Sequence, residues 1–168
     1  MKNIQIWLKN QNEPLNFMRF NKMKTQIGKA EEKELDEIAR IYAEEFSKPP
    51  YNESWTNGKA EKKIKYFFNN YDLYSIRFDG RLAGFITINP NFMCPGEVAF
   101  AEEFAIKKEF QGRNIGKIVL NELFEIYKKK GFKKFTGISS TSPRLLELYK
   151  LIGLSVSEDN VIVEKTLN

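Results

Sequence analysis

One short segment constrains the fold and function of this chain more than any other, and it lies between a predicted strand and a predicted helix. The segment is Gln111-Gly112-Arg113-Asn114-Ile115-Gly116. Residues 97–106 before it are apolar enough for a buried strand, and residues 115–130 after it place apolar side chains on one helical face. A glycine-bearing turn of this kind directs backbone N–H groups outward at the positive end of the helix dipole. We therefore expect it to bind a phosphate or pyrophosphate.

Composition limits the chemistry that could accompany such a turn. The chain has 168 residues, 42% of them hydrophobic, which suits one domain with its own core. It contains no histidine, which excludes Ser-His-Asp and Cys-His nucleophilic sites and histidine-ligated metals, so we expect no metal. Acid–base chemistry would fall to Asp, Glu, Tyr, Lys or water.

Cysteine content and charge bear on location and partners. A single cysteine, Cys94, allows no intrachain disulfide, which fits a cytoplasmic location. No apolar run approaches the roughly 20 residues of a membrane span, and the first residues lack the apolar region of a secretory signal. The net charge of +5 comes from dispersed basic residues, which favours a solvated surface over a nucleic-acid interface.

The periodicity of apolar residues predicts an α/β domain of the α+β type, with a mixed, largely antiparallel sheet flanked by helices. We expect this domain to span residues 24–168, and an apolar extension, residues 1–23, to pack on it or on a second subunit of a homodimer. Asp79-Gly80 is a strong signal for a two-residue hairpin turn. The expected strands are 25–29, 73–78, 81–88, 97–106, 134–139, 155–158 and 161–167, the last two as a closing hairpin, and the expected helices are 31–46, 58–71, 115–130 and 143–152.

Two adjacent acids, Glu102 and Glu103, interrupt the apolar strand. Neighbouring strand residues point to opposite faces, so a buried strand has no favourable position for both, and at least one should line a cleft. A carboxylate in a cleft has its pKa raised toward neutrality and can accept a proton from an amine. The alternative is that both acids lie near a strand end and face water or a lysine.

The turn and the late helix also have structural alternatives. Glycines between a strand and a helix occur simply for tight turning, but Arg113 and Lys117 on the same turn favour a polyphosphate ligand. The spacing is neither that of a P-loop nor that of a Rossmann motif. Tyr149, in the predicted helix 143–152, is either a core aromatic or a proton donor to a thiolate leaving group.

With these features together, the chain resembles the GNAT superfamily of acyl-CoA-dependent N-acyltransferases. The turn 111–116 matches its [Gln/Arg]-x-x-Gly-x-[Gly/Ala] signature, although Asn114 replaces the usual middle glycine. Phe104-Ala105-Ile106 matches the apolar-x-apolar triplet before it. Residues 142–154 are similar to a later family element, with Ser142 and Leu154 in place of the usual Asn and Phe. The resemblance covers roughly residues 24–167.

The resemblance implies a single GNAT-like domain that transfers an acetyl group from acetyl-CoA directly to a primary amine of a small molecule or peptide. It implies Glu103, or else Glu102, as the base and Tyr149 as the acid for the thiolate. The acceptor would lie between the loop at 51–55 and the hairpins at 72–88 and 154–167. A non-catalytic acyl-CoA-binding or sensing domain is the alternative. The implied cofactor-binding residues are Phe104, Ala105, Ile106, Gln111, Gly112, Arg113, Asn114, Ile115, Gly116, Lys117 and Ser142.

Overall fold

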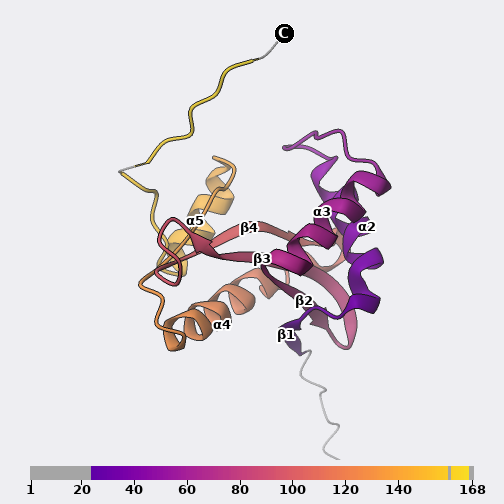
Figure 1. Ribbon diagram of the computed structural model, residues 1–168, viewed down its shortest axis with the longest axis horizontal. Coiled ribbons are helices and arrows are strands. Elements are labelled where there is room, and N and C mark those ends of the chain that lie inside the picture. The colour runs from indigo at the N-terminus through magenta and orange to yellow at the C-terminus, as the bar shows by residue number, and fades with distance from the viewer. Residues whose placement is uncertain (1–23, 159, 167–168) are drawn as a thin grey trace, which may run out of the picture.

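One five-stranded sheet, in the order β1-β2-β3-β4-β5, organises the chain (Figure 1). The computed structural model describes residues 24–158 and 160–166. The first four strands are β1 (Thr25–Lys29), β2 (Asp72–Phe78), β3 (Arg81–Phe92) and β4 (Val98–Ile106), and they pair with one another in antiparallel fashion. The last strand, β5 (Lys134–Gly137), is parallel to β4. The predicted α/β class and mixed, largely antiparallel sheet are confirmed. The interpretation of residues 1–23 lies outside the described residues.

Helices cover both faces of this sheet. One core cluster joins the sheet to α2 (Leu35–Phe46) and α3 (Asn57–Asn70), and a second joins it to α4 (Ile115–Lys129). Figure 1 shows α4 on the opposite side of the strands from α2 and α3. The short helix α5 (Pro143–Leu151) lies toward the β5 end of the molecule, away from α2. Two 3-10 turns, Glu32–Glu34 and Lys108–Phe110, precede α2 and α4.

Local sequence signals explain where these elements begin and end. The side chains of Glu31 and Glu34 form a capping box before α2, and the Thr56 hydroxyl accepts a hydrogen bond from the Lys59 N–H at the start of α3. The turn between β2 and β3 has φ values of 50° at Asp79 and 78° at Gly80, as the Asp-Gly pair predicted.

The predicted closing hairpin is wrong. Residues 154–158 and 160–166 form no strand, and Figure 1 shows this segment leading away from the sheet. Val161 and Val163 are 86% and 88% exposed. Alternating apolar residues indicate which side chains could face a sheet, but they do not supply a partner edge, and a two-stranded hairpin alone is marginally stable. The segment therefore does not form the expected wall of the acceptor site.

Strand β4 has two irregularities near its centre. β5 pairs with β4 only from Val98 to Ala101, so the β5-facing edge of residues 102–106 carries no strand. On the other edge, Thr87 of β3 pairs with Glu103 while the next residue, Ile88, pairs with Ala101. Glu102 is thus the extra residue of a β-bulge.

Candidate active site

The bulge determines the direction of the two adjacent carboxylates. Glu103 accepts a hydrogen bond from Tyr42 of α2, and Glu102 accepts one from Asn89 of β3. Asn89 and Thr87, the register partner of Glu103, are two residues apart on β3 and share a face. The regular alternation would have separated Glu102 from Glu103, but the bulge brings both to the face that α2 and α3 cover. Both acids therefore lie on one face of the sheet, between β3 and the helices that cover it.

Glu103 is a half-buried carboxylate with one neutral hydrogen-bond partner. The Tyr42 Oη atom donates to Glu103 Oε1 at 2.9 Å. Burial raises the pKa of Glu103, and the nearby carboxylates Glu53 and Glu102 raise it further, against opposing effects of Tyr42 and Lys63. The pKa of Tyr42 is itself raised, first by burial and then by the charge of Glu103, so the phenol stays protonated and donates. A carboxylate of this kind is suited to accept a proton near neutral pH.

Glu102 lies beside the C-terminal end of α3. Its Oε1 atom accepts a hydrogen bond from Asn89 Nδ2 at 3.0 Å. The pKa of Tyr71, the residue that follows α3, is raised to about 12 by a hydrogen bond with Tyr66, by burial and by the charge of Glu102. Glu102 thus faces polar neutral groups, and no lysine or arginine of the described residues forms an ion pair with it.

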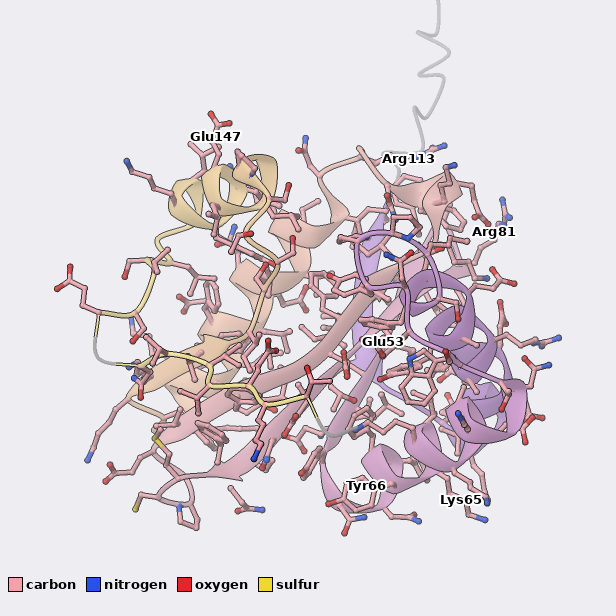
Figure 2. The ribbon with its side chains drawn as sticks, turned by 90° about the horizontal axis from the view of Figure 1, so that it is seen from above. Glu53, Lys65, Tyr66, Arg81, Arg113 and Glu147 are labelled. Atoms are coloured by element: carbon pink, nitrogen blue, oxygen red, sulfur yellow. The ribbon has the colours of Figure 1, made fainter. Side chains whose placement is uncertain are left out.

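The loop between α2 and α3 adds a third carboxylate and several aromatic rings. The Trp55 indole N–H donates to Glu53 Oε2, and the Trp55 ring packs edge-on against Tyr42, with 4.6 Å between ring centroids. Tyr51 packs on Phe46 at 5.0 Å and is 43% exposed. In Figure 2, Glu53 lies near the middle of the molecule, whereas Lys65 and Tyr66 lie at its outer edge. The loop therefore extends the environment of Glu103 toward solvent.

The unpaired edge of β4 leads from these carboxylates to the start of α4. Beyond Ala101, this edge of Phe104, Ala105 and Ile106 has no strand partner within the described residues. A Cβ atom built on Gly116 would lie 3.6 Å from the Phe104 ring, which shows how closely β4 and the first turn of α4 approach. An extended ligand could pair with this backbone edge and reach the helix N-terminus.

The turn before α4 has the conformation that an anion site requires. Asn114 adopts the left-handed region with φ 60° and ψ 12°, which asparagine tolerates better than most residues, so the replacement of the usual glycine leaves the turn intact. Gly112 has a φ of 76°. The Asn114 side chain makes no capping hydrogen bond, and the first helical bond is from Ile118 N–H to the Asn114 carbonyl. The N–H groups of residues 115–117 are therefore available to a ligand.

Three side chains of the motif have different roles from one another. Gln111 Nε2 donates to the Ile106 carbonyl at 2.8 Å and to Glu45 Oε2 at 3.3 Å, so this side chain holds the turn against β4 and α2. Arg113 donates to the Glu109 carbonyl and lies over the Phe78 ring, at the outer edge of the view in Figure 2. Lys117 is exposed in the first turn of α4. Of these three side chains, that of Lys117 belongs to the same helical turn as the free amides and has no partner in the described chain.

Helix α5 contributes the two remaining predicted residues. Ser142 precedes its first turn, and its N–H donates to Ser140 Oγ. Tyr149 is half-buried and packs against the core cluster of α4. The pKa of Tyr51 is raised first by burial and then by the charges of Tyr149, Glu103 and Glu53. The role predicted for Tyr149 as a proton donor stays a prediction.

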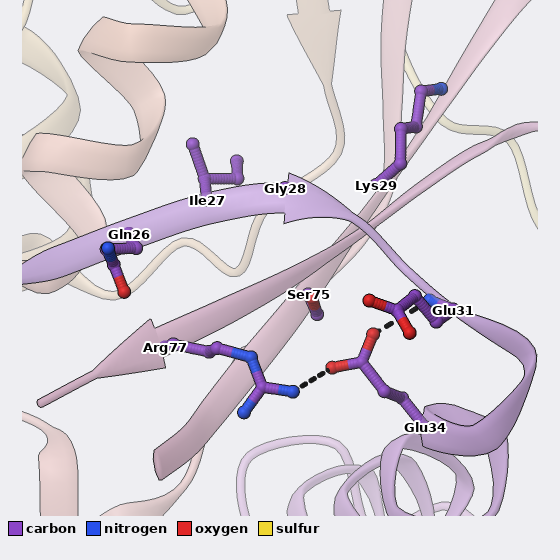
Figure 3. Close-up of a pocket in the computed structure, with 8 residues that line it drawn as sticks. All are labelled: Gln26, Ile27, Gly28, Lys29, Glu31, Glu34, Ser75 and Arg77. Carbon is purple, nitrogen blue, oxygen red and sulfur yellow. Dashed lines mark hydrogen bonds and ion pairs between the residues drawn. The ribbon is translucent and has the colours of Figure 1, made fainter. Parts of the chain in front are cut away.

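A separate pocket lies along β1 and has no comparable chemistry (Figure 3). Its buried acid, Glu34, accepts hydrogen bonds from Arg77 and from the Glu31 N–H at 2.7 Å, so both carboxylate oxygens are occupied. Figure 3 shows Ser75 of β2 beside this pair. The pocket has a paired carboxylate that fixes the start of α2, and it offers no free group for catalysis.

Sequence reasoning missed the residues that support the two carboxylates. Tyr42 reads as one more apolar position on a helical face, Thr87 as an ordinary strand residue, and Asn89 lies just beyond the predicted strand 81–88, whereas β3 continues to Phe92. The available signal was that the polar residues Thr87 and Asn89 are two positions apart, and so on one face, in an otherwise apolar stretch. In the described part of the chain, no group of three or more acids, cysteines or histidines could hold a metal ion. None of the helices described has the length and apolarity needed to cross a membrane.

Comparisons with known proteins agree with this geometry. The family model described as "Acetyltransferase (GNAT) family" matches residues 35–154. No curated protein matches the chain. A protein from Clostridium difficile 630 described as a possible acetyltransferase has a similar structure, with a TM-score of 0.71 at 12% identity over 86% of this chain and 99% of that one.

Two further solved structures share the fold. One is an aminoglycoside N-acetyltransferase in complex with CoA, with a TM-score of 0.67 at 12% identity over 86% of this chain and 97% of that one. The other is a ribosomal-protein-alanine N-acetyltransferase from Brucella melitensis biovar Abortus 2308. Its TM-score is 0.64 at 14% identity over 84% of this chain and 100% of that one. At these identities the likeness establishes the fold.

Proposed function

Because this chain belongs to the acetyltransferase (GNAT) family, we propose that it transfers an acetyl group from acetyl-CoA directly to a primary amine. One observation carries the proposal. A half-buried, unpaired carboxylate, Glu103, begins a strand edge that has no partner and that ends at three free amides of a helix N-terminus. Base, backbone edge and anion site therefore follow one another along a single path.

In this proposal, acetyl-CoA lies along that path. The amides of residues 115–117 and the left-handed turn at Gly112 and Asn114 bind the pyrophosphate, helped by the helix dipole and by Lys117. The open edge of residues 104–106 pairs with the pantetheine chain. A backbone N–H near Phe104 or Ala105 then faces the thioester carbonyl, where it stabilises the developing oxyanion.

Glu103 is proposed as the base. The acceptor enters as an ammonium ion and must lose a proton before it attacks, and the raised pKa of Glu103 suits it to take that proton directly or through one water. The Tyr42 hydroxyl holds the carboxylate in position. Tyr149 is proposed to give its phenolic proton to the departing CoA thiolate. Tyr149→Phe should then lower kcat more than it weakens acetyl-CoA binding, and unchanged turnover would remove this role.

The decisive experiment measures CoA thiol release from acetyl-CoA over a panel of primary amines, alongside direct binding of acetyl-CoA. Amine-dependent thiol release, with the acetylated amine identified by mass spectrometry, supports the enzyme. Binding of acetyl-CoA with no turnover on any amine would instead support the alternative, an acyl-CoA-binding or sensing domain. Analytical ultracentrifugation with and without residues 1–23 tests the proposed homodimer.

A further inference from the structure

The three carboxylates near Tyr42 have no ion-pair partner among the described residues. Six acids in the described residues form ion pairs with lysine or arginine, but Glu53, Glu102 and Glu103 form none. Their hydrogen-bond donors are neutral: the Trp55 indole, the Asn89 amide and the Tyr42 phenol. Three negative charges therefore converge without direct neutralisation.

A cation of α3 acts on Glu103 from a distance. Lys63 lowers the pKa of Glu103, but its ammonium lies over the Phe67 ring, 4.7 Å from the centroid. Within the described residues no cation forms an ion pair with any of the three carboxylates, although the whole chain carries a net charge of +5.

A buried hydroxyl next to Glu103 points independently to a ligand. Thr87 is fully buried, and its Oγ1 atom has no hydrogen-bond partner in the described chain. Thr87 is the direct register partner of Glu103, so the two side chains leave the sheet on the same face. Buried hydroxyls are almost always hydrogen-bonded, so this one is expected to bond to a group that enters beside Glu103.

A row of aromatic rings runs from the buried Tyr42 toward solvent. Tyr42 packs against Trp55 at 4.6 Å and against the buried Phe46 at 4.7 Å, and Tyr51, 43% exposed, packs on Phe46 at the outer end. The faces of accessible rings such as Trp55 and Tyr51 attract ammonium groups and also cover the methylene carbons between them. An acceptor with a carboxylate near its amine, such as a free amino acid, would be repelled by the same three acids.

We propose that the acceptor is a compact oligoamine with at least two ammonium groups, one reacting at Glu103 and another held by Glu102 and Glu53 among the aromatic rings. This inference rests on the proposed function and specifies its substrate class. Two ammonium groups would give these carboxylates the cationic partners that the described residues do not supply, and the reacting amine or its water would bond to the Thr87 hydroxyl. Diamines and aminosugars with several amines share this chemistry.

The test compares 1-aminobutane with 1,4-diaminobutane, which differ by one amine at the far end. We expect kcat/KM to be at least about tenfold higher for the diamine, the effect of one additional charge-assisted interaction. Glu102→Gln should lower the diamine-to-monoamine ratio of kcat/KM about tenfold, whatever its effect on the monoamine alone. Glu122→Gln, an exposed acid on α4, is the matched control and should change neither substrate.

The outcomes separate this inference from the proposed function. Equal use of both amines, or an equal loss on both with Glu102→Gln, would overturn the oligoamine inference while leaving an acetyltransferase. Calorimetric titration of 1,4-diaminobutane into the protein with CoA covers the case of no turnover. Binding that Glu102→Gln weakens would then support the oligoamine site and reject catalysis, and no binding would reject the site. Thermal melts of each variant confirm that the fold is retained.

Discussion

Asp72 of β2 and Glu103 of β4 are partly buried carboxylates on the same sheet, but their neighbours differ. Asp72 forms ion pairs with Lys29 and Lys130 and accepts a hydrogen bond from the Tyr127 hydroxyl. Burial alone would raise its pKa, yet these three partners together lower it. Among the described residues, the Tyr42 hydroxyl is the only side chain that donates a hydrogen bond to Glu103, and the pKa of Glu103 is raised.

The difference separates a structural carboxylate from one that is available to a ligand. Asp72 links β1, β2 and α4, and its charge is neutralised by the protein itself. Glu103 is held in place by a neutral donor, so its charge remains for an incoming cation. The same sheet therefore contains one carboxylate whose charge the protein neutralises and one that we propose takes part in catalysis, and mutations should separate the two.

The largest expected effect is that of Glu103→Gln on catalysis. Loss of a general base lowers kcat by about 10²- to 10⁴-fold. Stability should not fall at neutral pH. A carboxyl whose pKa is raised by folding stabilises the native state below its unfolded value of 4.5, and this contribution is lost as pH rises through the folded value. Steady-state kinetics and urea unfolding at pH 7 measure both quantities; a large stability loss with normal kcat would contradict the comparison.

Two helix N-termini differ in a similar way, because a side chain caps the backbone N–H groups of one and not those of the other. At α3 the Thr56 hydroxyl accepts from the Lys59 N–H, whereas at α4 the Asn114 side chain caps nothing. Gly58 and Gly116 occupy the second position of the two helices. A Cβ atom on Gly58 would meet nothing within 4 Å, and one on Gly116 would meet the Phe104 ring at 3.6 Å, an ordinary contact. A matched pair of substitutions can therefore test which terminus binds a ligand.

Gly116→Val should weaken acetyl-CoA binding by about tenfold or more, because the added methyl groups stand where the ligand must approach the amides. Gly58→Val carries the same helix penalty and should leave the affinity unchanged. Isothermal titration calorimetry gives both dissociation constants. Equal affinities for the two variants would remove the α4 N-terminus from the donor site.

The sequence predicted the elements of the core and the turn before α4 on which the proposed donor site rests. Apolar periodicity fixed the strand 97–106 and the helix after it, because a buried face requires regular spacing, and the turn motif located the free amides. It could not predict the bulge at Glu102, which depends on how β3 pairs with β4. Nor could it predict that residues 155–158 and 160–166 lack a partner edge, since pairing between distant segments is set by the whole sheet.

Asp72→Asn should show the opposite behaviour to Glu103→Gln. Loss of the charge breaks two ion pairs with lysines that are 54% and 44% exposed, so solvent screening limits the cost to about 1–2 kcal/mol of unfolding free energy. Because folding lowers the pKa of Asp72, its contribution is present above the unfolded value of 3.8 and is lost as pH falls below it. The wild-type advantage over Asp72→Asn should therefore vanish in acid, with kcat normal at pH 7.

The smallest expected effect is that of removing the hydrogen bond from Tyr42 to Glu103. The Tyr42 hydroxyl donates to the charged carboxylate and so lowers the pKa of Glu103 against the effect of burial. Tyr42→Phe removes this donor, so the pKa should rise further and the acidic limb of the kcat/KM profile should move to higher pH. At high pH, where Glu103 is ionised in both proteins, the rates should converge. Tyr127→Phe removes the phenol beside Asp72 in the same way and should leave the limb unmoved. A limb that moves with neither substitution would mean that another group is the base.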